Sequence, residues 1–262
     1  MSERLAIAGS FARAAGSYDE HAALQLAVAR DLDSLIAELP APQRAMDLGA
    51  GTAPLLRAQR TRWPSTRWLV VDIAEAMLRE AKDRGRLESG CQALCADAMA
   101  LPLTDASLDL LFSSFALQWC DSLPQLAGEL ARVLRPGAIL AISVPVAGTL
   151  TELRESWASA DHRDHVNALP SASDWQQALT NAGFVIHVQH QTRIRQHYPD
   201  LRAIGSMLRA TGAHHVFGNR PGGLTGRGKL AAVQDAYEKL REQEGLPLSW
   251  QVCLLLAEKT GD

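Results

Sequence analysis

The chain has 262 residues, 47% of them hydrophobic and 21% charged, enough for one large domain or two small ones and for a substantial core. The net charge of −3 excludes a generally basic nucleic-acid binder, and the composition argues against disorder and solenoid repeats. No apolar stretch approaches the roughly 20 residues that span a bilayer, and residues 1–20 lack a secretory apolar segment, so we expect a cytoplasmic protein that binds no membrane. The four cysteines are scattered, and the pair Cys91 and Cys95 has no second pair at zinc-ligand spacing, so neither a metal site nor a disulfide is predicted.

The first half of the chain alternates strand and helix patterns. Apolar residues at three- and four-residue spacing predict an amphipathic helix over 20–39. Strands are then predicted over 44–48, 67–72, 92–96, 108–113 and 138–144, and helices between them over 55–62, 75–84 and 124–134. Strictly alternating strands and helices form right-handed crossovers and a parallel sheet. The predicted fold class is therefore α/β, with a doubly wound, mostly parallel sheet.

The second half continues this sheet. A capped helix over 173–182 precedes a strand over 184–194. Helices over 199–211 and 226–243, joined by a Gly-rich segment, separate that strand from a last one over 250–258. We therefore predict a single domain over 1–262. It comprises an N-terminal helical cover (1–40), a Rossmann-like core (41–198 and 246–262) and an inserted helical lid (199–245).

The turn after the first strand is typical of a ligand-binding loop. Gly49 permits unusual backbone angles, and Gly51, which has no Cβ, lets a ligand approach the main chain closely. A dinucleotide fingerprint would have a third glycine at position 54, but that residue is Pro54, which offers no N–H to a phosphate. The acid at the strand end, Asp47, would also repel phosphate and attract a cationic amino acid moiety. The loop thus disfavours NAD and FAD.

Acidic residues also end the second and third strands. Asp72 stands 23 residues after Gly49, close to the spacing at which a carboxylate accepts hydrogen bonds from ribose hydroxyls. Asp97 could accept a hydrogen bond from an adenine amino group. Because the carboxyl ends of parallel strands share one edge of a sheet, Asp47, Asp72 and Asp97 should form a rim around an adenosine without phosphates. The alternative is that these acids cap helices or loops.

Four segments in this order and spacing resemble the class I S-adenosylmethionine-dependent methyltransferases: 47–52, Asp72 with Met77, 97–99 and 134–137. The resemblance covers roughly residues 40–145 and implies a seven-stranded sheet and S-adenosylmethionine as the cofactor. It implies contacts of Asp72 with the ribose and of Ile73 with the adenine. The cofactor-binding residues that it implies are Asp47, Gly49, Gly51, Asp72, Ile73, Met77, Asp97, Ala98, Met99, Ser113 and Gln118.

Features outside that region resemble one family, the malonyl-[acyl-carrier protein] O-methyltransferases of biotin synthesis. They are the segments 11–19 and 115–120, and the Gly-Leu-Thr-Gly-Arg of 223–227 with the Gly-Leu-Pro-Leu of 245–248. The resemblance implies methylation of the free carboxylate of the malonyl group, and the ester primes formation of a pimeloyl precursor. A carboxylate is already an anion at neutral pH, so no general base is required. Tyr18, Arg209 and Arg227 are the candidates for positioning this carboxylate.

The segment 193–229 carries seven Lys or Arg residues and one acid, a charge of +6 against −9 elsewhere. Acyl carrier proteins are acidic, so a basic lid favours docking of the carrier. The candidate docking residues are Arg202, Arg209, Arg220, Arg227 and Lys229. One rival interpretation is a small-molecule methyltransferase acting on a quinone precursor or a free dicarboxylic acid, which would not need a basic lid. Another is a non-catalytic nucleotide-binding or RNA-associated protein, although the segment has only two aromatic residues, Tyr198 and Phe217, on which bases could stack.

Overall fold

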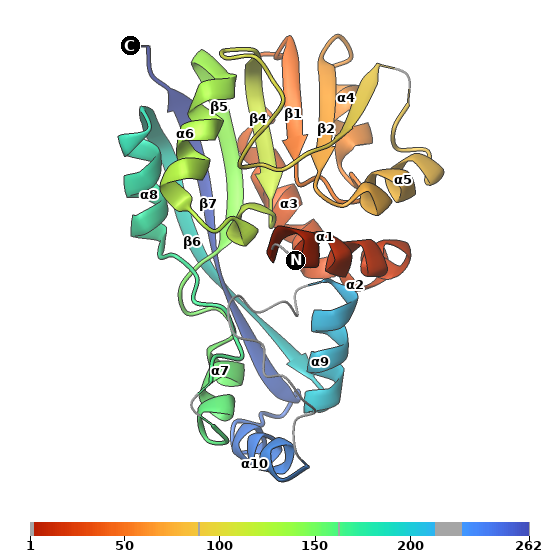
Figure 1. The fold of residues 1–262 in the computed structure, drawn as a ribbon, viewed down its shortest axis with the longest axis vertical. Coiled ribbons are helices and arrows are strands. Elements are labelled where there is room, and N and C mark those ends of the chain that lie inside the picture. Colours follow the sequence, from red (N-terminus) through yellow and green to blue (C-terminus); the bar gives the residue numbers. More distant parts are fainter. Residues whose placement is uncertain (1–2, 89, 162, 213–226, 262) are drawn as a thin grey trace.

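The computed structural model describes residues 3–88, 90–161, 163–212 and 227–261 of the chain (Figure 1). Seven strands form one sheet in the order β3-β2-β1-β4-β5-β7-β6. Their bounds are β1 Arg44–Leu48, β2 Arg67–Asp72, β3 Cys91–Cys95, β4 Leu108–Ser114, β5 Leu134–Pro145, β6 Phe184–Tyr198 and β7 Leu246–Lys259. Strands β1 to β5 pair in parallel, whereas β7 is antiparallel to both of its neighbours. The predicted α/β fold with a mostly parallel seven-stranded sheet is confirmed.

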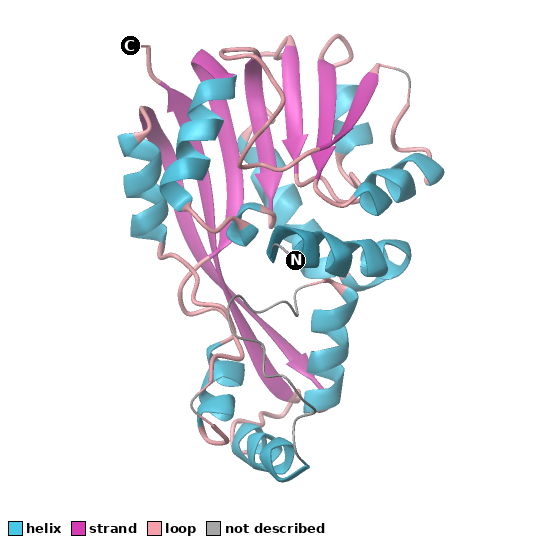
Figure 2. Ribbon diagram, viewed as in Figure 1, coloured by secondary structure: helices cyan, strands magenta, loops and turns pink. Residues whose placement is uncertain are grey.

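Helices cover both faces of the sheet, as the alternation of side chains along its strands requires (Figure 2). In β4, Leu110 and Phe112 pack on one side and Leu111 on the other. The first side is covered by α3 (Ala23–Leu35), α4 (Leu56–Arg62) and α5 (Glu75–Asp83). The second is covered by α6 (Leu123–Val133) and α8 (Ala172–Asn181). The strands are therefore buried between two hydrophobic layers. These layers cover the faces of the sheet and do not cover the carboxyl ends of β1 to β4.

The N-terminal segment lies across those carboxyl ends (Figure 1). It consists of α1 (Glu3–Ala14), the 3₁₀ turn η1 (Ala15–Ser17) and α2 (Tyr18–His21). The continuous helix predicted over 20–39 is wrong, because the backbone leaves helical geometry at Ala22 (φ −94°, ψ 29°), between α2 and α3. This break separates α2, which turns toward the sheet edge, from α3, which packs on the face of the sheet. No helix in the described ranges is both long and apolar enough to cross a bilayer.

The last two strands are longer than predicted and extend beyond the rest of the sheet. Strand β5 pairs with β7 as far as Val252, whereas β6 and β7 pair onward to Tyr198 and Leu246. Around this extension lie α7 (Thr151–Ala158), α9 (Leu201–Ala210) and α10 (Arg227–Glu238) (Figure 1). The sequence pattern did not predict α7. Its buried Glu152 carboxylate accepts hydrogen bonds from the backbone N–H and hydroxyl of Ser249, which fixes the helix to β7.

Candidate functional site

A cavity of about 340 Å³ opens at the carboxyl ends of β1 to β4, beneath α1 and α2. In a doubly wound sheet this edge is the expected ligand site, and the volume lies within the range of small-molecule pockets. The sequence-predicted residues that line the cavity are Asp47, Gly49, Gly51, Asp72, Ile73, Met77, Asp97, Ala98, Met99 and Tyr18. The fold thus gathers residues from three consecutive strand ends around one hollow.

The loop after β1 provides the floor of the cavity. Gly49 has φ +68°, and a Cβ there would lie 2.1 Å from the Cβ of Ala116, so only glycine fits between the two loops. Gly51 has φ +55°, and a Cβ there would meet no atom within 4 Å. The loop is anchored because the N–H groups of Gly49 and Ala50 donate to the carbonyl of Val71, at 2.7 and 3.0 Å. A ligand can therefore approach the backbone at Gly51, as the sequence predicts.

Asp72 joins this loop to the loop after β2. Its two carboxylate oxygens accept hydrogen bonds from the N–H groups of Gly51 and Ala74, both at 2.8 Å. Burial raises the pKa of Asp72 to about 6, although these two hydrogen bonds act to lower it. Each oxygen has a further lone pair, so the fixed carboxylate can still accept hydrogen bonds from a ligand. This geometry suits the ribose contact implied by the resemblance.

Asp47 is the one buried cavity carboxylate that has no hydrogen-bond or ion-pair partner among the described residues. Its exposed fraction is 5%. Burial, together with the negative charges of Asp72 and Asp33, raises the pKa of Asp47 to about 7. An unpartnered buried carboxylate is costly unless a cation neutralises it. A cationic group bound beside Asp47 would therefore remove this cost.

Tyr18 and Asp19 of α2 also line the cavity. Asp19 accepts hydrogen bonds from Arg86 and Thr52, both at 2.6 Å, and pairs with Arg84 at 3.2 Å. Burial acts to raise the pKa of Asp19, but these hydrogen bonds and charges hold it below its ordinary value. Burial, with the charges of Asp72 and Asp19, raises the pKa of Tyr18 well above its ordinary value, so the phenol stays protonated. Sequence reasoning missed Asp19 and Arg86.

Asp97 also has a partner that sequence reasoning missed. Arg4 of α1 donates to its carboxylate at 2.7 Å and also reaches Asp121, at 3.2 Å. The second oxygen of Asp97 accepts from the N–H of Met99 at 2.9 Å. Arg4 and Asp97 are 93 residues apart in the chain, and no local pattern links them.

Ser113 and Gln118 do not line the cavity, although the resemblance implies cofactor contacts for both. The Ser113 hydroxyl is fully buried and donates to the carbonyl of Leu48 at 2.7 Å. The Gln118 amide donates to the carbonyl of Phe115 at 2.8 Å. Phe115 has φ +53°, which is strained for a non-glycine residue, and its side chain lines the cavity. Both residues thus hold neighbouring backbone in place, and direct cofactor contacts for them stay predictions.

Of the candidate docking residues, Arg202, Arg209 and Lys229 are described and do not line the cavity. Arg202 and Arg209 lie on the exposed face of α9. Lys229 pairs with Asp161 at 2.9 Å, which neutralises part of its charge. Arg227 begins α10, but its side chain lies outside the described part of the structure, as does the whole of Arg220.

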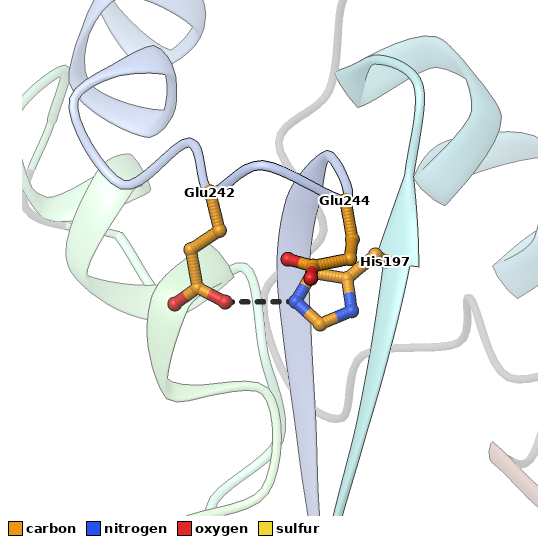
Figure 3. Close-up of side chains that lie close together, drawn as sticks. All are labelled: His197, Glu242 and Glu244. Atoms are coloured by element: carbon orange, nitrogen blue, oxygen red, sulfur yellow. Dashed lines mark hydrogen bonds and ion pairs between the residues drawn. The ribbon is translucent and has the colours of Figure 1, made fainter.

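A polar cluster at the far end of β6 lies outside the cavity (Figure 3). One ligand atom from each of His197, Glu242 and Glu244 lies within 4.8 Å of the others. Glu242, however, already pairs with Arg195 at 2.6 Å and with the His197 ring at 2.8 Å. Because Arg195 supplies the positive charge, we interpret the cluster as an ion-pair network that closes the β6–β7 extension.

The chain resembles known methyltransferases in sequence and fold. Residues 46–142 match the family model described as a methyltransferase domain. A malonyl-[acyl-carrier protein] O-methyltransferase of Alcanivorax borkumensis is 48% identical over 260 residues, covering 99% of this chain and 88% of that protein. Its namesake in Methylococcus capsulatus is 40% identical over 95% of this chain and 92% of that protein. The solved geranyl diphosphate C-methyltransferase of Streptomyces coelicolor shares the fold, with a TM-score of 0.55 at 14% identity, over 90% of this chain and 80% of that one.

Proposed function

This chain belongs to the family of malonyl-[acyl-carrier protein] O-methyltransferases, and we propose that it transfers a methyl group from S-adenosylmethionine to the free carboxylate of a malonyl group held on an acyl carrier protein. In this proposal the methyl ester primes pimeloyl formation in biotin biosynthesis. The observation that carries the proposal is the cavity at the carboxyl edge of the sheet, with an unpartnered buried Asp47 in its wall. The rival quinone, free-acid and RNA interpretations have no comparable support.

The residues of the cavity fit this cofactor. Asp47 would pair with the ammonium group of the methionine moiety, which removes the cost of its burial. The open side of Gly51 leaves room for that moiety against the backbone. Asp72, held by two N–H groups, would accept hydrogen bonds from the ribose hydroxyls. Ile73 and Met99 would contact the adenine, with Asp97 at its edge.

The chemistry requires positioning rather than proton removal. When bound, the cofactor supplies an electrophilic methyl group on a sulfonium sulfur. The acceptor carboxylate is ionised at neutral pH, so no residue has to act as a general base. Tyr18 keeps its proton, and its hydroxyl has no partner among the described residues, so it is free to donate to the acceptor carboxylate. Two aromatic residues, Phe11 and Trp119, also line the cavity and pack edge to face, with ring centroids 5.7 Å apart, and would limit the access of water to the acceptor.

The carrier would dock on α9. The exposed face of this helix carries Arg202 and Arg209, and its buried face carries Ile204 and Leu208. Gly212, just after the end of the helix, packs against a residue of the cavity wall. A Cβ at this position would lie 2.7 Å from the ring of Phe11, which lines the cavity. A carrier held by the two arginines would thus present its prosthetic arm at the cavity mouth. In this proposal the electrostatic contact mainly accelerates association.

The direct test incubates the protein with methyl-labelled cofactor in four separate reactions, each with one acceptor: malonyl-carrier, malonyl-coenzyme A, malonate or RNA. We expect label in base-labile ester on the malonyl-carrier. Equal labelling of malonate would support a small-molecule enzyme instead. Label on RNA alone would refute the proposal.

Charge reversal tests the docking surface. Replacing Arg202 and Arg209 by Glu should raise KM for the carrier about tenfold or more at low salt and leave the Kd for cofactor unchanged. The matched control reverses Arg30 and Arg57, which are exposed on α3 and α4. An equal rise in KM in the control, or a parallel loss of cofactor affinity in the α9 variant, would contradict a docking role for α9.

A further inference from the structure

Arg4 ties the N-terminal helix to two loops of the core. Its guanidinium donates to Asp97, after β3, at 2.7 Å and to both oxygens of Asp121, after η2 (Leu117–Trp119), at 3.2 and 3.4 Å. The Arg4 and Asp97 side chains are only 34% and 27% exposed, and Asp121 is 52% exposed. Arg4 thus bridges two carboxylates. Its contact with Asp97 is shielded from solvent, whereas its contact with Asp121 is exposed to solvent.

The bridge fixes the orientation of the Asp97 carboxylate. One oxygen accepts from Arg4 and the other from the N–H of Met99, so both oxygens are held from different sides. Each oxygen retains a lone pair. Because Arg4, Asp97 and Met99 all line the cavity, a carboxylate fixed in this way can present a lone pair to a donor at one defined position.

The same bridge holds α1 over the cavity. Ile7 and Phe11 lie on the cavity side of α1, and Arg4 fixes the start of this helix to the core. Arg4 is also the one cation that contacts Asp97 or Asp121 among the described residues. Without Arg4, two carboxylates would lie near each other with no positive charge between them, which favours their separation and loosens α1.

We propose that Arg4 is a cofactor-positioning residue, which fixes Asp97 toward the amino group of the adenine and closes α1 over this end of the cofactor. This inference rests on the proposed function, in which Asp97 contacts the adenine edge. It assigns base selectivity to a residue of the N-terminal helix, outside the Rossmann-like core. An adenine donates from its exocyclic amino group, whereas hypoxanthine has an acceptor oxygen there that a fixed carboxylate rejects.

The test measures binding rather than turnover. The Kd values of S-adenosylhomocysteine and S-inosylhomocysteine are measured by calorimetry for the wild type, Arg4→Ala and Arg4→Lys. The control is Arg13→Ala, an exposed arginine on the same helix that bonds Ser10 of that helix. Thermal unfolding verifies that each variant is folded. The wild type should prefer the adenosyl compound by about tenfold or more, the effect of one charge-assisted hydrogen bond.

Arg4→Ala should weaken S-adenosylhomocysteine about tenfold and bring the ratio of the two Kd values close to one. Arg4→Lys should recover part of the ratio, because an ammonium can pair with Asp97 but cannot bridge two carboxylates as a guanidinium fork does. Arg13→Ala should match the wild type. If the ratio of the two Kd values in Arg4→Ala equals that of the wild type, whether neither compound or both bind more weakly, the positioning role is overturned and the proposed function stays intact. Failure of the wild type to bind S-adenosylhomocysteine would overturn both.

Discussion

Cofactor affinity should fall as the pH is lowered through neutrality, because Asp47 must be ionised to receive a cation. In the ligand-free protein the pKa of Asp47 is raised to about 7 by burial and by the charges of Asp72 and Asp33. A bound ammonium group favours the ionised form, so the pKa of Asp47 in the complex is lower than in the free protein. The affinity is therefore complete above the free pKa and is lost as pH falls through it.

The magnitude follows from the fraction of Asp47 that is ionised. If the complex keeps Asp47 charged, lowering the pH from about 7.5 to about 6 raises Kd about eightfold, and binding at the lower pH releases about one proton. The α-amino group of the ligand has an ordinary pKa of about 7.7 to 8 and stays mostly charged over this range. Calorimetry of S-adenosylmethionine in two buffers of different ionisation enthalpy measures both quantities.

Asp47→Asn is the matched control, since it keeps the shape of the side chain and removes the titration. The variant should bind about tenfold or more weakly at pH 7.5 and should lose the pH dependence. Ligand-free, it should be more stable than the wild type. Because the pKa of Asp47 is about 3.8 in the unfolded chain and higher in the folded protein, ionisation of Asp47 lowers the free energy of unfolding of the wild type as the pH rises from about 4 to about 7. The loss is on the order of a few kcal/mol, and it is absent in Asp47→Asn because Asn does not ionise. Flat wild-type affinity without proton release, or the same slope in Asp47→Asn, would refute the assignment of the cation to Asp47.

Three further variants separate the roles of residues around the cavity. Asp72→Ala should raise the Kd for cofactor at least about tenfold, since each charge-assisted hydrogen bond contributes about 1.5 to 3 kcal/mol; unchanged calorimetric affinity would refute the ribose contact. Tyr18→Phe should lower kcat about 10- to 100-fold with little change in the Kd for cofactor, and a change confined to that Kd would contradict a role toward the acceptor. Gln118→Met should lower the free energy of unfolding by about 1 to 3 kcal/mol, because the strained Phe115 turn loses its amide donor. If Gln118→Met instead binds the cofactor more weakly and has an unchanged free energy of unfolding, the result would support a direct contact between Gln118 and the cofactor.

Local patterns predicted the positions of the core elements because each depends on residues near one another in the chain. The β1 and β2 strands have the predicted bounds, since apolar runs flanked by turn residues specify buried strands. Asp47 and Asp72 line the cavity because the carboxyl ends of parallel strands meet at one edge, whatever the details of packing. The extra length of β6 and β7 had no local signal, because those residues pair only with each other, across a long insertion.

The sequence by itself determined the fold class, the edge of the sheet at which the cavity opens and the acidic residues around it, because periodicity and strand-end position are local properties. Only the tertiary structure decided which partner each charged group has. It joined Arg4 to Asp97 and Asp19 to Arg86, and it left Asp47 without a partner among the described residues. Such pairs are formed when distant segments pack together, and burial then sets their pKa values, so no spacing along the chain encodes them.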